Sequence, residues 1–175
     1  MSHLNLTVEL AEKSNFCNRY LELCSRYSES LLMDTTDLRQ RYPRSLANIT
    51  KKVVDTKLVK SIFDSLGYRY KYFGGEKFYR VYLLKGTEYE VWFHLQLYKN
   101  SSFDGFLDPH VYIQYNGKYF AGGTFPCIFE GAGGVKPTKY MLRPAYTGEV
   151  LSELIKELID LAFSYVYEFE ELKEG

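Results

Sequence analysis

The chain has 175 residues, of which 46% are hydrophobic and 25% charged, and its formal net charge at neutral pH is zero. These ordinary values predict one globular domain over residues 1–175. No apolar stretch approaches the roughly 20 residues that span a bilayer, and the N-terminus lacks the basic and apolar segments of a secretory signal. The three cysteines form no CxxC spacing, so we expect a cytoplasmic protein without a disulfide framework.

The N-terminal third is predicted to be helical. An apolar stripe at spacings of three and four residues comprises Phe16, Tyr20, Leu23, Tyr27 and Leu31. Pro43 ends any helix in the segment that follows. A further helix is predicted after Asp55, a suitable N-cap, and it ends at Gly67, because glycine readily adopts the conformation that closes a helix.

From Tyr68 onward the apolar period becomes two, which is typical of strands. Four strands are predicted from the segments YRYKYF, FYRVYLL, YEVWFHLQLY and HVYIQY, with KYFA as a short fifth. The pair Asn116-Gly117 predicts a tight hairpin, since both residues tolerate positive φ. Successive hairpins of this kind make an antiparallel meander.

A long amphipathic helix is predicted to begin near Thr147 or Gly148. Its apolar stripe consists of Leu151, Leu154, Ile155, Leu158, Ile159, Ala162, Tyr165 and Val166. Such a stripe packs on a sheet. The predicted fold class is therefore α+β, with N-terminal helices, a four- to five-stranded antiparallel sheet and a closing C-terminal helix.

The segment from Gly122 to Tyr146 is predicted to be a long loop, because it contains five glycines and three prolines. Part of it, IFEGAGGVKPT, is reminiscent of a phosphate-binding loop. However, Lys136 does not follow a glycine and Pro137 offers no backbone donor, which argues against nucleotide binding there. The loop is either a functional element around Phe125 and Phe129 or a crossover to the last helix.

The strand YEVWFHLQLY separates two kinds of side chain. The aliphatic and aromatic set Val91, Phe93, Leu95 and Leu97 is expected to face the helices, which leaves Glu90, Trp92, His94, Gln96 and Tyr98 on the other face. In HVYIQY the same alternation gives His110, Tyr112 and Gln114. Rings and polar tips together suit a recognition platform, although an ordinary solvated or helix-covered face has the same pattern.

Catalytic and metal-binding motifs are sparse. The three histidines have no H-x-x-x-H spacing and no G-x-S-x-G is present, so neither a metal nor a cofactor is expected. His94 and His110 become neighbours if the strands pair in the obvious register, and with Glu90 they would provide acid–base groups. Cys127 would need a nearby base to act as a nucleophile, and the alternative is a buried or half-buried thiol.

The charge is unevenly distributed. Residues 39–85 contain twelve Lys and Arg against three Asp and Glu, whereas residues 149–175 contain eight acidic residues against two lysines. Either the two regions neutralise each other in the fold, or the acidic region faces a basic partner.

The stretch from Ser61 to Ser102 is similar to a group of uncharacterised bacterial domains in which a Leu-Gly-aromatic step precedes a Phe-Tyr-Arg strand. The matching residues are Leu66, Gly67, Tyr68, Phe78, Tyr79, Arg80 and Gln96. That group implies no known activity. In type and size the chain also resembles the immunity proteins that bacteria pair with toxins, which are small α+β proteins that inhibit by binding.

These observations predict a non-catalytic binding protein, an immunity protein that covers the active site of a cognate toxin such as a basic nuclease domain. It would act as a monomer or dimer without a membrane partner. The predicted partner-binding residues are Trp92, His94, Tyr112, Phe125, Phe129, Glu153, Glu157 and Asp160. Two alternatives stay open: an RNA- or single-stranded-DNA-binding module that stacks bases on the sheet, against which the zero net charge counts, and a small enzyme that uses His94 and His110.

Overall fold

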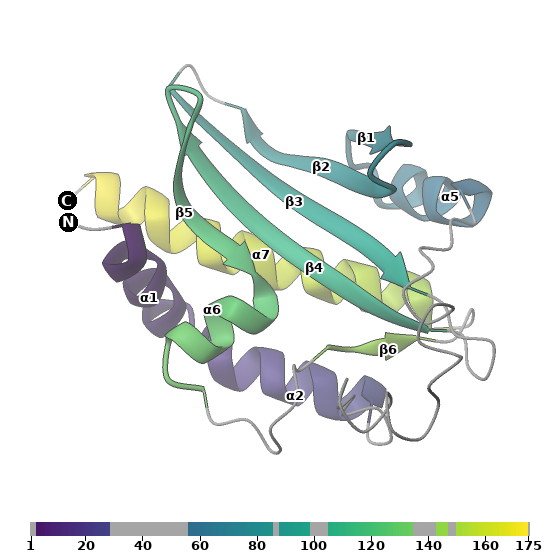
Figure 1. The fold of residues 1–175 in the computed structure, drawn as a ribbon, viewed down its shortest axis with the longest axis horizontal. Coiled ribbons are helices and arrows are strands. Elements are labelled where there is room, and N and C mark those ends of the chain that lie inside the picture. Colours follow the sequence, from purple (N-terminus) through teal and green to yellow (C-terminus); the bar gives the residue numbers. More distant parts are fainter. Residues whose placement is uncertain are drawn as a thin grey trace.

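The computed structural model describes residues 3–28, 56–85, 88–98, 105–134, 143–146 and 150–174. In this part of the chain, helices pack against one face of an antiparallel sheet, which confirms the predicted α+β class (Figure 1). The helices are α1 (His3–Lys13), α2 (Phe16–Ser28), α5 (Thr56–Leu66), α6 (Phe125–Gly131) and α7 (Leu151–Glu174). No helix within the described ranges is long and apolar enough to cross a membrane.

The sheet is an antiparallel meander in the order β1-β2-β3-β4-β5. Its strands are β1 (Tyr70–Phe73), β2 (Phe78–Lys85), β3 (Tyr89–Tyr98), β4 (Gly105–Tyr115) and β5 (Lys118–Thr124). A short strand, β6 (Ala145–Tyr146), pairs with the first residues of β4. Asn116 and Gly117, with φ of 47° and 74°, form the predicted hairpin turn between β4 and β5.

The α5 helix ends as the sequence predicts. Gly67 has a φ of 74°. Its N–H donates to the carbonyl of Asp64, and the N–H of Tyr68 donates to the carbonyl of Phe63 at 3.2 Å. This pair of bonds is a Schellman motif, which satisfies the last carbonyls of the helix and turns the chain into β1. Asp55, Leu31 and Pro43 lie outside the described residues.

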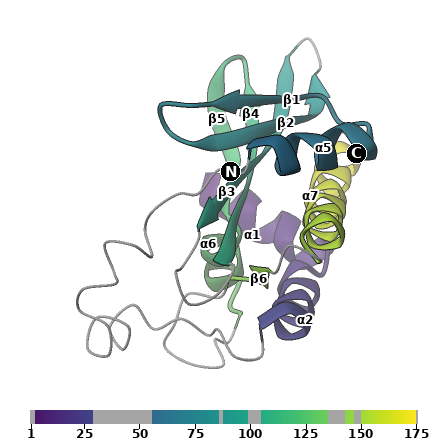
Figure 2. The same ribbon diagram turned by 90° about the vertical axis from the view of Figure 1, so that its right-hand side faces the viewer.

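The core lies between the helices and the sheet. All eight residues of the predicted α7 stripe are buried, as are Val91, Phe93, Leu95 and Leu97 of β3. In Figure 1, α7 runs behind the strands, and Figure 2 shows α5 beneath β1 and β2. The N-terminal helices are two separate elements because Asn15 adopts a left-handed conformation, with a φ of 53°.

The strand β2 has apolar side chains in both of its alternating sets, so its sequence does not assign its two faces, and the strand is irregular. Tyr79 and Val81 are buried in the core. The pairing with β3 shifts between Tyr82 and Leu84, which inserts one residue. Leu83 and Leu84 are consequently both half-buried against the core.

The prediction of a long loop from Gly122 to Tyr146 is wrong for the first part of this segment. The β5 strand continues to Thr124, and α6 follows at once. The side chain of Thr124 caps this helix by accepting a hydrogen bond from the N–H of Cys127, at 3.2 Å. Pro126 lies in the first turn, where its missing N–H leaves no helical hydrogen bond unmade.

Phe125 and Phe129 are core residues, so the prediction that they form a partner surface is wrong. Their exposed fractions are 0% and 1%. The Phe125 ring lies 5.0 Å from that of Phe16 and 5.5 Å from that of Tyr20, both on α2. The short helix buries these rings between β4, β5 and the N-terminal helices. The expectation of a buried or half-buried Cys127 thiol is also wrong, because Cys127 is exposed.

Gly122 lies close to the backbone of β4. It has a φ of 106°, and a Cβ atom there would lie 2.1 Å from the carbonyl oxygen of Val111. Its N–H donates to Oγ1 of Thr7 at 3.1 Å, which ties β5 to α1. Glycine is therefore required at this position by both space and backbone conformation.

Candidate binding site

The sheet face opposite the helices carries aromatic and polar side chains, and we call it the open face. Its residues are Phe78, Arg80, Trp92, His94, Gln96, His110, Tyr112 and Gln114, with Glu76 and Tyr119 at the rim. Together they line a hollow of about 430 Å³, a volume within the range of ligand-binding pockets. The described helices pack on the opposite face of the sheet, where their buried residues form the core. This is the face to which the alternation in β3 assigns its aliphatic side chains.

Strand register brings three predicted site residues together. His94 pairs with Arg80 of β2 on one side and with His110 of β4 on the other, so the predicted neighbourhood of the two histidines is confirmed. Their ring centres are 6.4 Å apart. Trp92 pairs with Tyr112 in the adjacent row, which places Trp92, His94 and Tyr112 on one surface.

Arg80 occupies the centre of the open face and is half-buried. Its guanidinium carbon lies 4.0 Å from the ring centre of Trp92 and 4.8 Å from that of Phe73. Its Nε donates to Nε2 of His94 at 2.9 Å. Stacking and this hydrogen bond hold the guanidinium in one orientation. Arg80 is not among the predicted partner-binding residues, because the sequence of β2 does not assign its two faces.

His94 is held in its neutral form. Burial lowers its pKa from 6.5 to about 3, and the nearby positive charge of Arg80 acts in the same direction. Because a guanidinium only donates, Nε2 of His94 is the acceptor and the ring proton is assigned to Nδ1. This Nδ1–H has no hydrogen-bond partner in the part of the chain that the structure describes, so it is available as a donor.

A second polar group runs along β4. Nε2 of His110 lies 3.3 Å from Oδ2 of Asp108, and Nδ1 of the same ring lies 3.0 Å from the Tyr112 hydroxyl. Asp108 is buried and accepts a hydrogen bond from Nε of Arg143 at 3.0 Å. Burial alone would raise the pKa of Asp108, but His110 and the charge of Arg143 outweigh it and lower the pKa. Burial raises the pKa of Tyr112, so this phenol stays protonated.

The environment of His94 does not favour acid–base catalysis by the two histidines. A pair of catalytic histidines needs one ring to accept and the other to donate a proton near neutral pH. The Nε2 lone pair of His94 is already engaged by Arg80, and its pKa of about 3 keeps the ring uncharged. Glu90 is not among the residues that line the hollow. Within the described residues, no group of three or more His, Cys, Asp or Glu is arranged to hold a metal.

The acidic residues predicted to bind the partner lie elsewhere. Glu153, Glu157 and Asp160 are on α7, across the core from the open face. Glu157 accepts two hydrogen bonds from Arg26 of α2, at 3.0 and 2.8 Å, so part of its charge is neutralised within the fold. The predicted partner-binding residues therefore lie in three separate places, which are the open face, the core and the outer side of α7.

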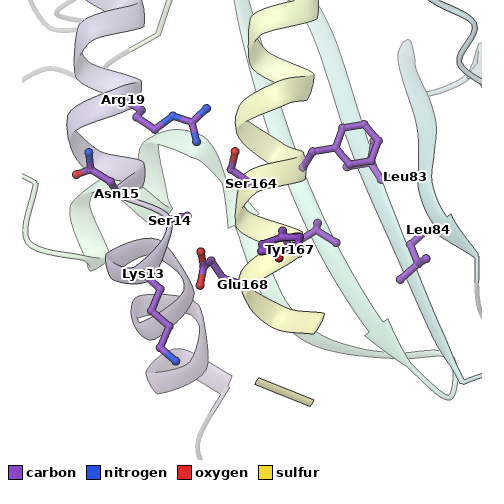
Figure 3. A pocket seen from close by; sticks show the side chains of 11 residues that line it. Lys13, Ser14, Asn15, Arg19, Leu83, Leu84, Ser164, Tyr167 and Glu168 are labelled. Carbon is purple, nitrogen blue, oxygen red and sulfur yellow. The ribbon is translucent and has the colours of Figure 1, made fainter. Parts of the chain in front are cut away.

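A second hollow of about 500 Å³ lies on the helical side (Figure 3). Side chains of α7, among them Ser164 and Tyr167, lie there between the turn joining α1 to α2 and two leucines of β2. Lys13 at its edge forms an ion pair with Glu9, at 3.6 Å. The open face, where the Trp92 and His94 rings stack and the Arg80 guanidinium lies over Trp92, is the better candidate site.

No protein-family model matches the chain, and neither a curated protein nor a solved structure matches it. The functional argument therefore depends on the geometry of the open face.

Proposed function

We propose that the protein is a non-catalytic binding protein whose open face receives a protein partner. The observation that carries this proposal is the cluster of Arg80, Trp92 and Tyr112 at the centre of the open face. Arg, Trp and Tyr are the residue types in which interface hot spots are most enriched. The amides of Gln96 and Gln114 are half-buried beside them, which adds polar groups to an aromatic centre.

The cluster is rigid before any partner arrives. The Trp92 and His94 rings are stacked with an interplanar angle of 9°, and Phe78 stacks on His94 with ring centres 4.6 Å apart. All three side chains project from paired strands rather than from a loop. A surface that is already ordered loses little conformational entropy on binding, which favours affinity.

We further propose that the partner is a toxin and that the protein acts as its immunity protein. The size of the chain, its α+β fold and the aromatic and polar side chains of the open face are consistent with inhibition by covering an active site. The acidic side chains Glu153 and Asp160, on the far side of the molecule, would then affect the rate of association rather than contribute contacts.

The experiment is a pull-down with the tagged protein from its source cells, followed by reconstitution with the purified product of the adjacent gene. We expect a one-to-one complex and inhibition of the enzymatic activity of that product. Tyr112→Ala should weaken the complex by about 30-fold or more, as expected for a hot-spot residue. Lys156→Ala, an exposed position on α7, is the matched control and should have no effect.

Two outcomes contradict the proposal. One is a complex of unchanged affinity in Tyr112→Ala and also in Tyr119→Ala, a rim residue with 47% exposure whose truncation spares the core. The other is a complex that does not inhibit its partner. Thermal unfolding of each variant shows whether a loss of binding reflects the surface rather than the fold.

One observation favours single-stranded nucleic acid as a second candidate. Two cations lie over rings on this side of the sheet, since Nζ of Lys71 is 5.0 Å from the ring centre of Phe73 and Arg80 stacks on Trp92. Base stacking on such rings is tolerant of sequence. Binding of an oligothymidylate with a steep dependence on salt concentration would support this candidate, and no binding at low salt would reject it.

A further inference from the structure

Resting on the proposed function, we propose that Arg80 receives a single carboxylate, from an aspartate or glutamate side chain of the partner protein, inside the hollow of the open face.

Arg80 lacks an acidic partner of its own. Among the described residues it forms no ion pair, and its one hydrogen bond is the donation from Nε to His94. The rings of Trp92 and Phe73 lie against the guanidinium. Its two Nη groups therefore remain as donors, and they form the edge that binds a carboxylate with two parallel hydrogen bonds.

A neutral donor of the ring beneath Arg80 also lacks an acceptor. The indole Nε1–H of Trp92 is buried, in a side chain that is only 9% exposed, and it has no hydrogen-bond partner in the described part of the chain. Buried donors in proteins are normally paired, so this unpaired N–H of the ring on which Arg80 stacks indicates that an acceptor from outside belongs here.

The site fits one anion rather than a polyanion. The hollow has a volume of about 430 Å³, and Arg80 is the only cationic residue among those that line it. Glu76 lies at its rim, and Glu90 pairs with Gln114 on the same side of the sheet. The buried carboxylate of Asp108 is engaged by Arg143 and His110. Successive phosphates of a nucleic acid would meet these acidic groups along the sheet, whereas one side-chain carboxylate needs only the donor edge of Arg80.

The first test uses NMR and a small probe. Trp92 is the only tryptophan of the chain, so a ¹⁵N-labelled sample gives a single indole signal, directly beside Arg80. N-acetyl-glutamate N-methylamide should shift this signal saturably at low salt, and the glutamine analogue, which differs only by the charge, should not. In Arg80→Gln the shift should disappear, whereas Lys118→Gln, an exposed lysine outside the hollow with the same change in charge, should retain it.

The second test uses the complex with the partner. Arg80→Gln should weaken it at least tenfold more than Lys118→Gln does, and Arg80→Lys should recover only part of the loss, because a lysine keeps the charge without the bidentate edge. The unfolding temperatures of the variants must match those of the wild type. If Arg80→Gln fails to fold, the glutamate and glutamine probes on the wild-type protein still decide the question.

The inference and the proposed function fail differently. If Tyr112→Ala weakens the complex but Arg80→Gln does no more than Lys118→Gln, the carboxylate site is wrong and the binding face stands. If the glutamate probe binds at Arg80 but no open-face variant affects the partner, the proposed function is wrong. An oligothymidylate that shifts the Trp92 signal at lower concentration than the glutamate probe, with steep salt dependence, overturns the inference in favour of nucleic acid.

Discussion

Acidification should destabilise the protein through His94 before most carboxylates are protonated. The pKa of His94 is about 3 in the folded protein and 6.5 as an ordinary histidine. Above pH 6.5 the ring is neutral in both states, so it makes no pH-dependent contribution. As the pH falls from 6.5 towards 3, the unfolded chain binds a proton that the folded protein does not, and the free energy of unfolding decreases.

The size of this effect follows from the shift. A full shift in a completely buried site would correspond to about 5 kcal/mol. His94 is only half-buried, so solvent screening reduces the expected loss to about 2 kcal/mol over the whole range. The groups that face it are Arg80, which stays charged, and His110.

The assay is urea unfolding of the wild type and of His94→Gln, whose amide oxygen can accept the Arg80 hydrogen bond but does not titrate. Between about pH 7 and about pH 4.5 the wild type should lose about 1 to 1.5 kcal/mol more than the variant, because the two proteins differ in no other ionisable group. Equal slopes for the two proteins would refute the reasoning. So would an NMR titration of the His94 ring with a midpoint near 6.5, its ordinary value.

Three further predictions concern the fold that holds the open face. Gly122→Ala should lower the free energy of unfolding, measured in urea, by about 3 to 5 kcal/mol, because the new Cβ strains the backbone and overlaps β4. Gly75→Ala is the control and should change this free energy by less than about 0.5 kcal/mol, because a Cβ there meets nothing within 4 Å. Similar losses in the two variants would contradict the close contact between β4 and β5. In the native protein Cys127 should react with a thiol reagent and Cys24, which is buried with a raised pKa, should react only after denaturation. Phe125→Ala should cost about 3 to 5 kcal/mol in stability, and a variant of unchanged stability would mean that this ring is not in the core.

Local patterns in the sequence predicted much of this structure. The period of two in β3 separated Val91 and Phe93 from Trp92 and His94, and the structure places the first pair in the core and the second on the open face. Strand alternation is a local property, so it can be read without knowledge of the rest of the fold. The turn at Asn116-Gly117 and the end of α5 were predicted for the same reason.

The sequence could not locate two other features, because they depend on irregular or long-range structure. The β2 strand contains both apolar alternations, and the inserted residue between Tyr82 and Leu84 resolves them only once pairing with β3 is known. Arg80 was therefore not recognised as the centre of the site. The density of glycine and proline around Phe125 was typical of a loop, yet Pro126 lies in the first turn of a capped helix.

The acidic residues of α7 show a different limitation. Their clustering in sequence predicted a patch for a basic partner, but sequence does not reveal which side of a helix faces which side of the molecule. Glu157 is paired with Arg26, and the α7 stripe that packs on the sheet leaves the acidic side chains far from the open face. Contacts with the partner are therefore expected from strand residues and not from α7.

The most direct test of the account is the dissociation constant of the complex with the partner protein, measured side by side for wild type, Tyr112→Ala and Lys156→Ala. The account predicts a loss of about 30-fold or more for Tyr112→Ala and no change for the α7 variant. A loss confined to Lys156→Ala, with Tyr112→Ala binding as tightly as wild type, would place the interface on the helical side and contradict the account.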